Sequence, residues 1–166
     1  MGIVACYAGS FDPVTKGHEN IALRAAGIFD KLVVAVGVNG EKKSFFPLER
    51  RLQWLKDCFR QVPNIEVLSY EGLTVELCHR CGASVLVRGV RSIVDYEMER
   101  NVAAVNRVLC PDIETLLLFT ADELAHVSSS NVREILANGG DASAFLPETV
   151  RTAISCATSK KWMSHE

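Results

Sequence analysis

Residues 9–18, which read GSFDPVTKGH, combine side chains that could bind phosphate. They include hydroxyl groups at Ser10 and Thr15 and the imidazole of His18, and a stretch of helical periodicity follows. The first turn of a helix offers free N–H groups and a positive dipole end, both of which favour phosphate. The alternative is a simple turn at Asp12-Pro13 with His18 on the surface. Neither a dinucleotide fingerprint nor a P-loop is present.

Two arginines stand at the end of a run of valine and leucine, in the sequence Arg88-Gly89-Val90-Arg91. A guanidinium group is planar and can hold one phosphate through two hydrogen bonds. Because the run itself indicates a buried strand, its terminal cations predict a phosphate site. The alternative is that both arginines form surface ion pairs with Asp95 and Glu97, which would contribute little to stability.

Two further polar segments could add to such a site. Residues 127–134 read VSSSNVRE, and Ser129 or Ser130 could cap a helix there. Capping needs one serine, whereas three in a row add hydroxyl and N–H donors that suit a triphosphate. Taken alone, this segment favours neither role. The pair Lys42-Lys43 lies in a loop at residues 39–46 and would ordinarily be solvated charge, but it follows a predicted strand.

Apolar runs rich in β-branched residues alternate with stretches of helical period. Predicted strands occupy residues 3–8, 32–38, 65–70, 85–90 and 115–120, and predicted helices occupy residues 17–29, 48–60, 74–81 and 93–109. Two more helices are expected to begin near Ser129 or Ser130 and near Pro147. The alternation is typical of an α/β fold, a doubly wound parallel sheet with helices on both faces. Ligands of such sheets bind beyond the carboxyl ends of the strands, where the four polar segments are expected.

Length and composition indicate one globular domain. The chain has 166 residues, of which 48% are hydrophobic and 23% charged, and its net charge is −2. We expect one domain over residues 1–158 and a polar tail at residues 159–166 that frays. The charge balance argues against nucleic acid as a partner, and no apolar run reaches the ~20 residues that span a membrane. The first residues lack the features of a secretory signal, so we expect a cytoplasmic location.

The cysteines could in principle form a metal or redox site. The chain contains Cys6, Cys58, Cys78, Cys81, Cys110 and Cys156. Cys78 and Cys81 have the spacing of a metal or redox pair, but no second pair completes a tetrahedral site. Most of the cysteines lie in apolar stretches, where a free thiol packs as a small hydrophobe. We therefore predict that they bind no metal.

The sequence Thr15-x-Gly17-His18 after a first strand resembles the (T/H)xGH motif of the nucleotidylyltransferase superfamily, which is related to class I aminoacyl-tRNA synthetases. Those enzymes cleave ATP or CTP between the α- and β-phosphates, and the histidine stabilises the transition state. Together, GSFDPVTKGH, the lysine pair, RGVRSIVDYEMER, VSSSNVRE and FLPE resemble the bacterial phosphopantetheine adenylyltransferases over residues 3–155. The resemblance implies a single-domain Rossmann-like fold of about five strands. It also implies transfer of the adenylyl group of ATP to 4′-phosphopantetheine.

The resemblance further implies roles for individual residues. His18 matches the transition-state stabiliser, and Ser10, Lys42 and Arg91 complete the expected catalytic group. Positions that match ATP-binding residues are Ser10, Phe11, His18, Gly89, Val90, Arg91, Glu99, Leu124, Ala125, His126, Val127, Ser128, Ser129 and Ser130. Positions that match acceptor-binding residues are Ser10, Lys42 and Arg88 at its phosphate, and Thr74, Val102, Val105, Asn106 and Leu109 along the pantetheine arm. The sequence departs from the family at Ser10, usually threonine, and at Ala8, often proline.

The implied reaction is in-line attack of an acceptor phosphate oxygen on the α-phosphorus of ATP, with pyrophosphate leaving. A phosphate monoester is mostly dianionic at neutral pH, because its second pKa is about 6, so the nucleophile needs no general base. The obstacle is repulsion, since two unit charges about 4 Å apart repel by ~4 kcal/mol at an effective dielectric near 20. Lys42, Arg88, Arg91 and a magnesium ion that arrives with the nucleotide are expected to offset it.

The resemblance also implies a homohexamer and feedback binding of coenzyme A. Three alternatives remain open. An enzyme of the same superfamily could use another acceptor, such as nicotinamide mononucleotide or glycerol phosphate. A nucleotide-binding sensor could use the same site without chemistry. A synthetase fragment is the third, although the chain is short and has no KMSKS-like loop.

Overall fold

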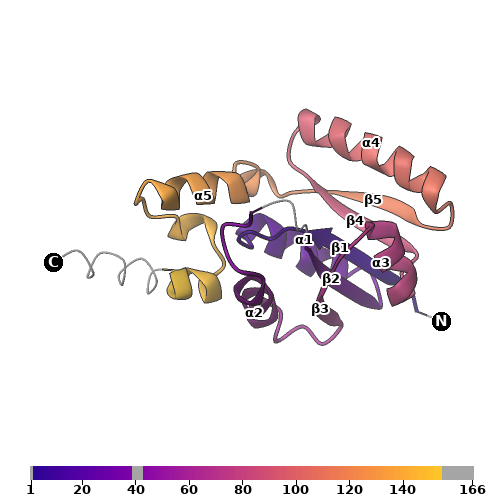
Figure 1. The fold of residues 1–166 in the computed structure, drawn as a ribbon, viewed down its shortest axis with the longest axis horizontal. Helices are drawn as coiled ribbons and strands as arrows, with labels where there is room; N and C mark the ends of the chain where they lie inside the picture. Colours follow the sequence, from indigo (N-terminus) through magenta and orange to yellow (C-terminus); the bar gives the residue numbers. More distant parts are fainter. Residues whose placement is uncertain (1, 39–42, 155–166) are drawn as a thin grey trace.

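The computed structural model describes residues 2–38 and 43–154. Its sheet consists of five parallel strands, β1 (Val4–Gly9), β2 (Lys31–Gly37), β3 (Ile65–Tyr70), β4 (Val85–Val90) and β5 (Glu114–Phe119). Their order across the sheet is β3-β2-β1-β4-β5 (Figure 1). The predicted α/β fold with a parallel sheet is therefore confirmed, and each predicted strand lies within one residue of its observed position.

Helices connect successive strands, and further helical segments come after the last strand in the chain. They are α1 (Lys16–Ala26), α2 (Leu48–Cys58), α3 (Thr74–Cys81), α4 (Ile93–Leu109) and α5 (Ser129–Ala137), with short 3-10 turns η1 (Asp122–Leu124) and η2 (Ser143–Phe145), and residues 148–154 are helical as well. The predicted ends of the first two helices were too late, because α1 ends at Ala26 and α2 at Cys58, with Gly27 and Phe59 as their C-caps. Phe29 lies beyond α1 but still packs against the core, so it extends the apolar pattern past the helix.

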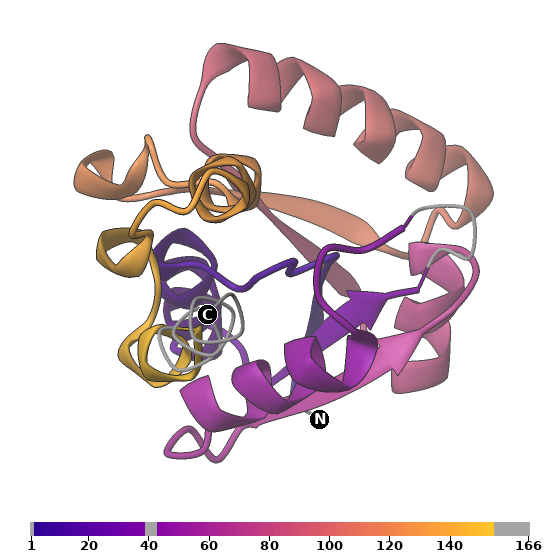
Figure 2. The same ribbon diagram turned by 60° about the vertical axis from the view of Figure 1, so that its left-hand side comes forward.

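Apolar side chains cover both faces of the sheet. Along β1, Ala5 and Tyr7 pack into a core cluster with residues of α1 and α2, whereas Cys6 and Ala8 pack into a second cluster with residues of α3. All four are buried. Figures 1 and 2 show α4 along the β4–β5 side of the sheet, away from α1 and α2. Two covered faces explain why the central strands are nearly continuous apolar runs.

The strand order reverses beside β1, which has β2 on one side and β4 on the other. Tyr7 of β1 lies opposite Val87 of β4, so the loop after β1 and the segment from Arg88 to Arg91 leave the sheet at the same level. This position is the switch point at which ligands of open parallel sheets bind. The fold therefore brings two of the predicted polar segments together.

Several expectations concern parts of the chain that the structure does not describe. The predicted domain boundary at residue 158, the tail at residues 159–166, Cys156 and Lys42 all lie outside the described residues. Within residues 2–38 and 43–154, no helix combines the length and apolar character needed to cross a membrane.

Gly89 of β4 packs closely against α1. A Cβ at position 89 would lie 3.2 Å from Cγ1 of Ile21, whose side chain is 1% exposed and has little room to move. We predict that Gly89→Ala lowers the free energy of unfolding by about 1–3 kcal/mol, because it overpacks this contact. A urea titration measures the change. Gly27→Ala is the matched control, since Gly27 has a φ of −77° and a Cβ there would meet its nearest atom at 3.5 Å. Equal losses in both variants would contradict this account of the packing.

Candidate active site

A cavity of about 330 Å³ lies at the carboxyl edge of the sheet, beside the switch point. Its walls come from the loop after β1, the end of β4 and the start of α5, so three separately predicted segments meet in space. The predicted site residues that line it are Ser10, Phe11, His18, Arg88, Gly89, Arg91, Glu99, Val127, Ser128, Ser129 and Ser130. Tyr7, Thr120 and Arg133 line it as well, and the sequence had given no reason to assign them a role.

The other predicted site residues do not line this cavity. They are Thr74, Val90, Val102, Asn106, Leu124, Ala125 and His126, together with Val105 and Leu109. Thr74 begins α3, where its hydroxyl lies 2.9 Å from the hydroxyl of Tyr70. The other positions predicted along the pantetheine arm lie on α4, which has no buried residue. The structure therefore assembles the predicted phosphate site and leaves the predicted arm contacts apart from it.

Phe11 occupies an unusual backbone conformation in the loop after β1. Its φ is +44°, which is uncommon for a residue with a side chain and which occurs preferentially at functional sites. The ring is 1% exposed and makes edge contacts with Tyr7 and His18, at centroid distances of 5.4 and 5.0 Å. Phe11 nevertheless lines the cavity.

Side chains from three other elements hold carbonyl groups of this loop and of the end of β1. The bonds join Nη1 of Arg88 to Ala8, Nη1 of Arg51 to Ser10, Nη1 of Arg133 to Asp12 and Oγ of Ser129 to Pro13, at 2.7, 2.8, 2.7 and 2.8 Å. In addition, the carboxylate of Asp12 accepts from the backbone N–H groups of residues 45 and 46. The loop is therefore fixed by β4, α2 and α5 together, and small displacements of any of them would reach it.

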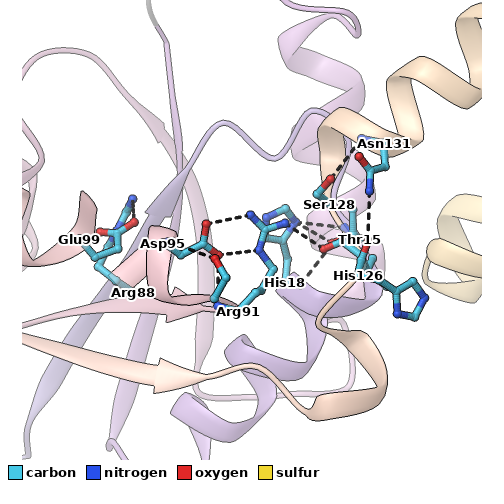
Figure 3. Close-up of polar contacts among 11 residues, drawn as sticks. Thr15, His18, Arg88, Arg91, Asp95, Glu99, His126, Ser128 and Asn131 are labelled. Atoms are coloured by element: carbon cyan, nitrogen blue, oxygen red, sulfur yellow. Dashed lines mark hydrogen bonds and ion pairs between the residues drawn. The ribbon is translucent and has the colours of Figure 1, made fainter. Parts of the chain in front are cut away.

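His18 is held by a reciprocal pair of hydrogen bonds at the start of α1. The Thr15 hydroxyl accepts from the backbone N–H of His18, and Nδ1 of His18 accepts from the backbone N–H of Thr15 at 3.1 Å (Figure 3). A backbone N–H can only donate, so Nδ1 carries no proton in this arrangement and the neutral ring is protonated at Nε2. Nε2 lies on the opposite edge of a ring that lines the cavity, where it can donate a hydrogen bond.

The imidazole of His18 is held in its neutral form. Burial lowers the pKa of His18, the charges of Arg91 and Arg88 lower it further, and the result is a pKa of about 4. At neutral pH the ring is therefore a neutral hydrogen-bond donor. It has no role as a proton acceptor through Nδ1, which the backbone occupies.

The two arginines at the end of β4 each face a carboxylate of α4. Arg88 forms two hydrogen bonds of 2.7 Å with Glu99, and Arg91 bonds Asp95 through Nε at 2.8 Å and Nη2 at 3.2 Å (Figure 3). Burial favours the neutral form of Asp95, yet the hydrogen bonds from Arg91 hold its pKa below the usual range. The alternative prediction of ion pairs with Asp95 and Glu97 is confirmed for Asp95 but wrong for Glu97, because Glu99 is the partner of Arg88. Asp95 and Glu99 share a helix face because they are four residues apart, whereas Glu97 does not.

The serines at the start of α5 have different partners. Ser128 is the N-cap and accepts from the N–H of Asn131 at 3.1 Å, so the expectation of a cap at Ser129 or Ser130 was wrong. Ser129 donates to the loop after β1, and Ser130 accepts from Nη2 of Arg133. The hydroxyl groups are therefore engaged within the protein. The N–H of Asn131 is taken by the cap at Ser128, which leaves the N–H groups of Ser129 and Ser130 for an anion in the cavity.

The described cysteines Cys6, Cys58, Cys78, Cys81 and Cys110 are free thiols. Cys6 of β1 and Cys78 of α3 are fully buried in the core cluster between these two elements. Within the described residues, no group of three or more histidine, cysteine, aspartate or glutamate side chains could hold a metal.

The ionisation of His18 is directly measurable. We predict that in the free protein the His18 ring titrates near pH 4, well below the value of about 6.5 expected for the unfolded chain. Because the folded value is the lower one, the contribution of His18 to stability is complete above about pH 6.5 and is lost as the pH falls toward 4. A ¹⁵N-detected NMR titration of the imidazole measures it. Titration at or above pH 6.5 would contradict the environment described.

Known proteins resemble this chain over most of its length. A family model described as cytidylyltransferase-like matches residues 6–135. A phosphopantetheine adenylyltransferase of Flavobacterium psychrophilum is 46% identical over 147 residues, covering 89% of this chain and 97% of the relative. One of Porphyromonas gingivalis is 46% identical over 145 residues, covering 87% and 94%.

Solved structures share the fold. The crystal structure of a candidate nicotinate-nucleotide adenylyltransferase from Vibrio parahaemolyticus has a TM-score of 0.70 at 15% identity and covers 92% of this chain and 98% of its own. A lipopolysaccharide core biosynthesis protein from Thermoplasma volcanium has a TM-score of 0.52 at 17% identity, covering 73% and 98%. At these identities the likeness concerns the fold alone. Because the two relatives named above are 46% identical to this chain over 89% and 87% of its length, the chain belongs to the phosphopantetheine adenylyltransferase family.

Proposed function

We propose that the protein transfers the adenylyl group of ATP to 4′-phosphopantetheine, which gives dephospho-coenzyme A and pyrophosphate. The observation that carries this proposal is the neutral, fixed imidazole of His18, which faces the same cavity as Arg88 and Arg91. The family to which the chain belongs supplies the identity of both substrates. We propose a cytoplasmic location for the enzyme, because free thiols are typical of a reducing compartment.

The geometry fits a reaction that needs stabilisation of charge and no general base. The acceptor phosphate is already mostly dianionic at neutral pH, since its second pKa is about 6. Nε2–H of His18 would donate to a nonbridging oxygen of the α-phosphate as negative charge builds there. A neutral donor suits this role, because it keeps its proton throughout and no proton transfer has to accompany the attack. Ser10 would present its hydroxyl at the same wall of the cavity.

The arginines would bind the phosphates with hydrogen-bond donors that remain. A guanidinium has five N–H groups. Arg88 donates two of them to Glu99 and one to the carbonyl of Ala8, so two remain. The carboxylates orient the two forks, so the arginines are positioned before the substrates arrive. Lys42, proposed as an acceptor-phosphate ligand, lies outside the described residues.

Magnesium is proposed as part of the nucleotide substrate. Asp95 and Glu99, the carboxylates that line the cavity, are both taken up by arginine, so neither offers a free metal ligand. Mg²⁺ prefers near-octahedral oxygen coordination and commonly takes it from substrate phosphates and water. We therefore propose that MgATP is the form that binds.

The acceptor is tested by pyrophosphate release from MgATP with and without 4′-phosphopantetheine. We expect release only when the acceptor is present, and we expect His18→Ala to lower kcat by about 10²–10³-fold while the Kd of ATP changes little. The reason is that the donor acts on charge that develops in the transition state. Activity with nicotinamide mononucleotide or glycerol phosphate alone would move the proposal to another acceptor. Nucleotide binding without release would favour a sensor, and equal losses in kcat and affinity would contradict the role of His18.

We further propose that the protein self-associates through α4, as a homohexamer like the family that it resembles. Val94, Met98, Val105 and Val108 are exposed in the single chain, at 66, 63, 59 and 81%. Their spacing places them along one stripe of the helix, and an exposed apolar stripe of this kind marks an interface. The site for feedback by coenzyme A is proposed to overlap the substrate cavity, because the molecule contains the product.

Self-association is tested by light scattering after size exclusion. We expect the native protein to have several times the mass of one chain, and Val108→Glu to shift it to smaller species, because a charge in an apolar interface is costly. Leu23→Glu on α1 is the control, since Leu23 is also an exposed apolar residue of a helix but lies outside the stripe. A native monomer, or the same shift in both variants, would contradict the interface.

A further inference from the structure

Arg51 is a buried charge directly beneath the loop after β1. It lies on α2 and is 4% exposed, and Nη1 donates to the carbonyl of Ser10 at 2.8 Å. Its Nε is buried and has no hydrogen-bond partner. Over residues 2–38 and 43–154, no carboxylate forms an ion pair with Arg51.

An unpaired buried guanidinium is costly, and native structures rarely keep one without a reason. The other arginines at the cavity differ, because Arg88 and Arg91 each have a carboxylate partner. The loop carries one carboxylate of its own, that of Asp12, but it accepts from the backbone N–H groups of residues 45 and 46 instead. Among the described residues, the positive charge of Arg51 is therefore left without a carboxylate partner, and it lies behind a loop that lines the cavity.

The bond to Ser10 also sets the direction of one peptide group. The peptide bond between Ser10 and Phe11 is trans, so the N–H of Phe11 points away from the carbonyl that Arg51 holds. That N–H has no acceptor among the described residues, and Phe11 lines the cavity. A released carbonyl could rotate toward the phosphates and present an oxygen to them, which would be repulsive.

We propose that Arg51 is a positioning residue, which turns the Ser10–Phe11 peptide so that its N–H faces a bound polyphosphate, and whose positive charge, which has no carboxylate partner among the described residues, adds to the positive potential at that polyphosphate. The catalytic part of this inference rests on the proposed adenylyl transfer. The anion-binding part does not, because it concerns phosphate groups of any origin.

The proposal predicts that binding and stability respond in opposite ways. Arg51→Met keeps the apolar stem and removes the charge, so the ligand-free protein should melt at the same or a higher temperature. The same variant should bind inorganic tripolyphosphate roughly tenfold more weakly, because a charge-assisted orientation of the donor is lost. Arg51→Lys retains the charge and should recover part of the affinity. Arg50→Met is the matched control, because Arg50 is the adjacent arginine but is exposed.

The experiment combines thermal melts without ligand, calorimetric titration with tripolyphosphate, and kcat and KM for MgATP in all four proteins. The expected pattern is weaker binding and lower kcat in Arg51→Met, partial rescue in Arg51→Lys and little change in Arg50→Met. A lower melting temperature in Arg51→Met with unchanged tripolyphosphate affinity would overturn the proposal, as would equal effects in Arg50→Met. If the native protein transfers no adenylyl group, the proposed function fails, but the binding and melting results still decide the role of Arg51.

Discussion

The hydrogen bond from the backbone N–H of Thr15 to Nδ1 of His18 determines what the imidazole can do. It fixes the proton on Nε2, and it holds the ring at the first turn of α1, where the helix also presents free N–H groups. The pKa of about 4 then keeps the ring neutral. A charged histidine here would add a third cation beside Arg88 and Arg91. The site thus separates two tasks, since the arginines carry the positive charge and the histidine supplies an uncharged donor.

The loop after β1 depends on this arrangement and on its neighbours. Its carbonyl groups are held by side chains of β4, α2 and α5, so two of the elements that wall the cavity, β4 and α5, also support the loop. The positive charges near the cavity differ in whether a carboxylate balances them. Those of Arg88 and Arg91 are balanced by Glu99 and Asp95, whereas Arg51 has no carboxylate partner among the described residues. Such a site is arranged before substrates bind, which is the condition for electrostatic catalysis without large rearrangement.

Much of the fold was predictable because its signals are local. Continuous apolar runs marked the strands, and the segments around His18, Arg88 and Ser128 were identified from sequence before their meeting point was known. The pairing of Arg88 with Glu99 could have been found, because Asp95 and Glu99 are one helical turn apart. Arg51 could not have been found, since its partner is a backbone carbonyl 41 residues away and carries no side-chain signal. The cap at Ser128 was ambiguous because three adjacent serines were equally suitable.

The reaction proposed for the cavity is attack of the acceptor phosphate on the α-phosphorus of ATP. The most direct measurement is a ³¹P NMR spectrum of MgATP and 4′-phosphopantetheine incubated with the protein. We expect the loss of the acceptor monoester signal, a new diphosphate signal from dephospho-coenzyme A and an equal amount of free pyrophosphate. The appearance of ADP, which would indicate transfer of the γ-phosphate, or an unchanged acceptor signal would contradict the proposed reaction.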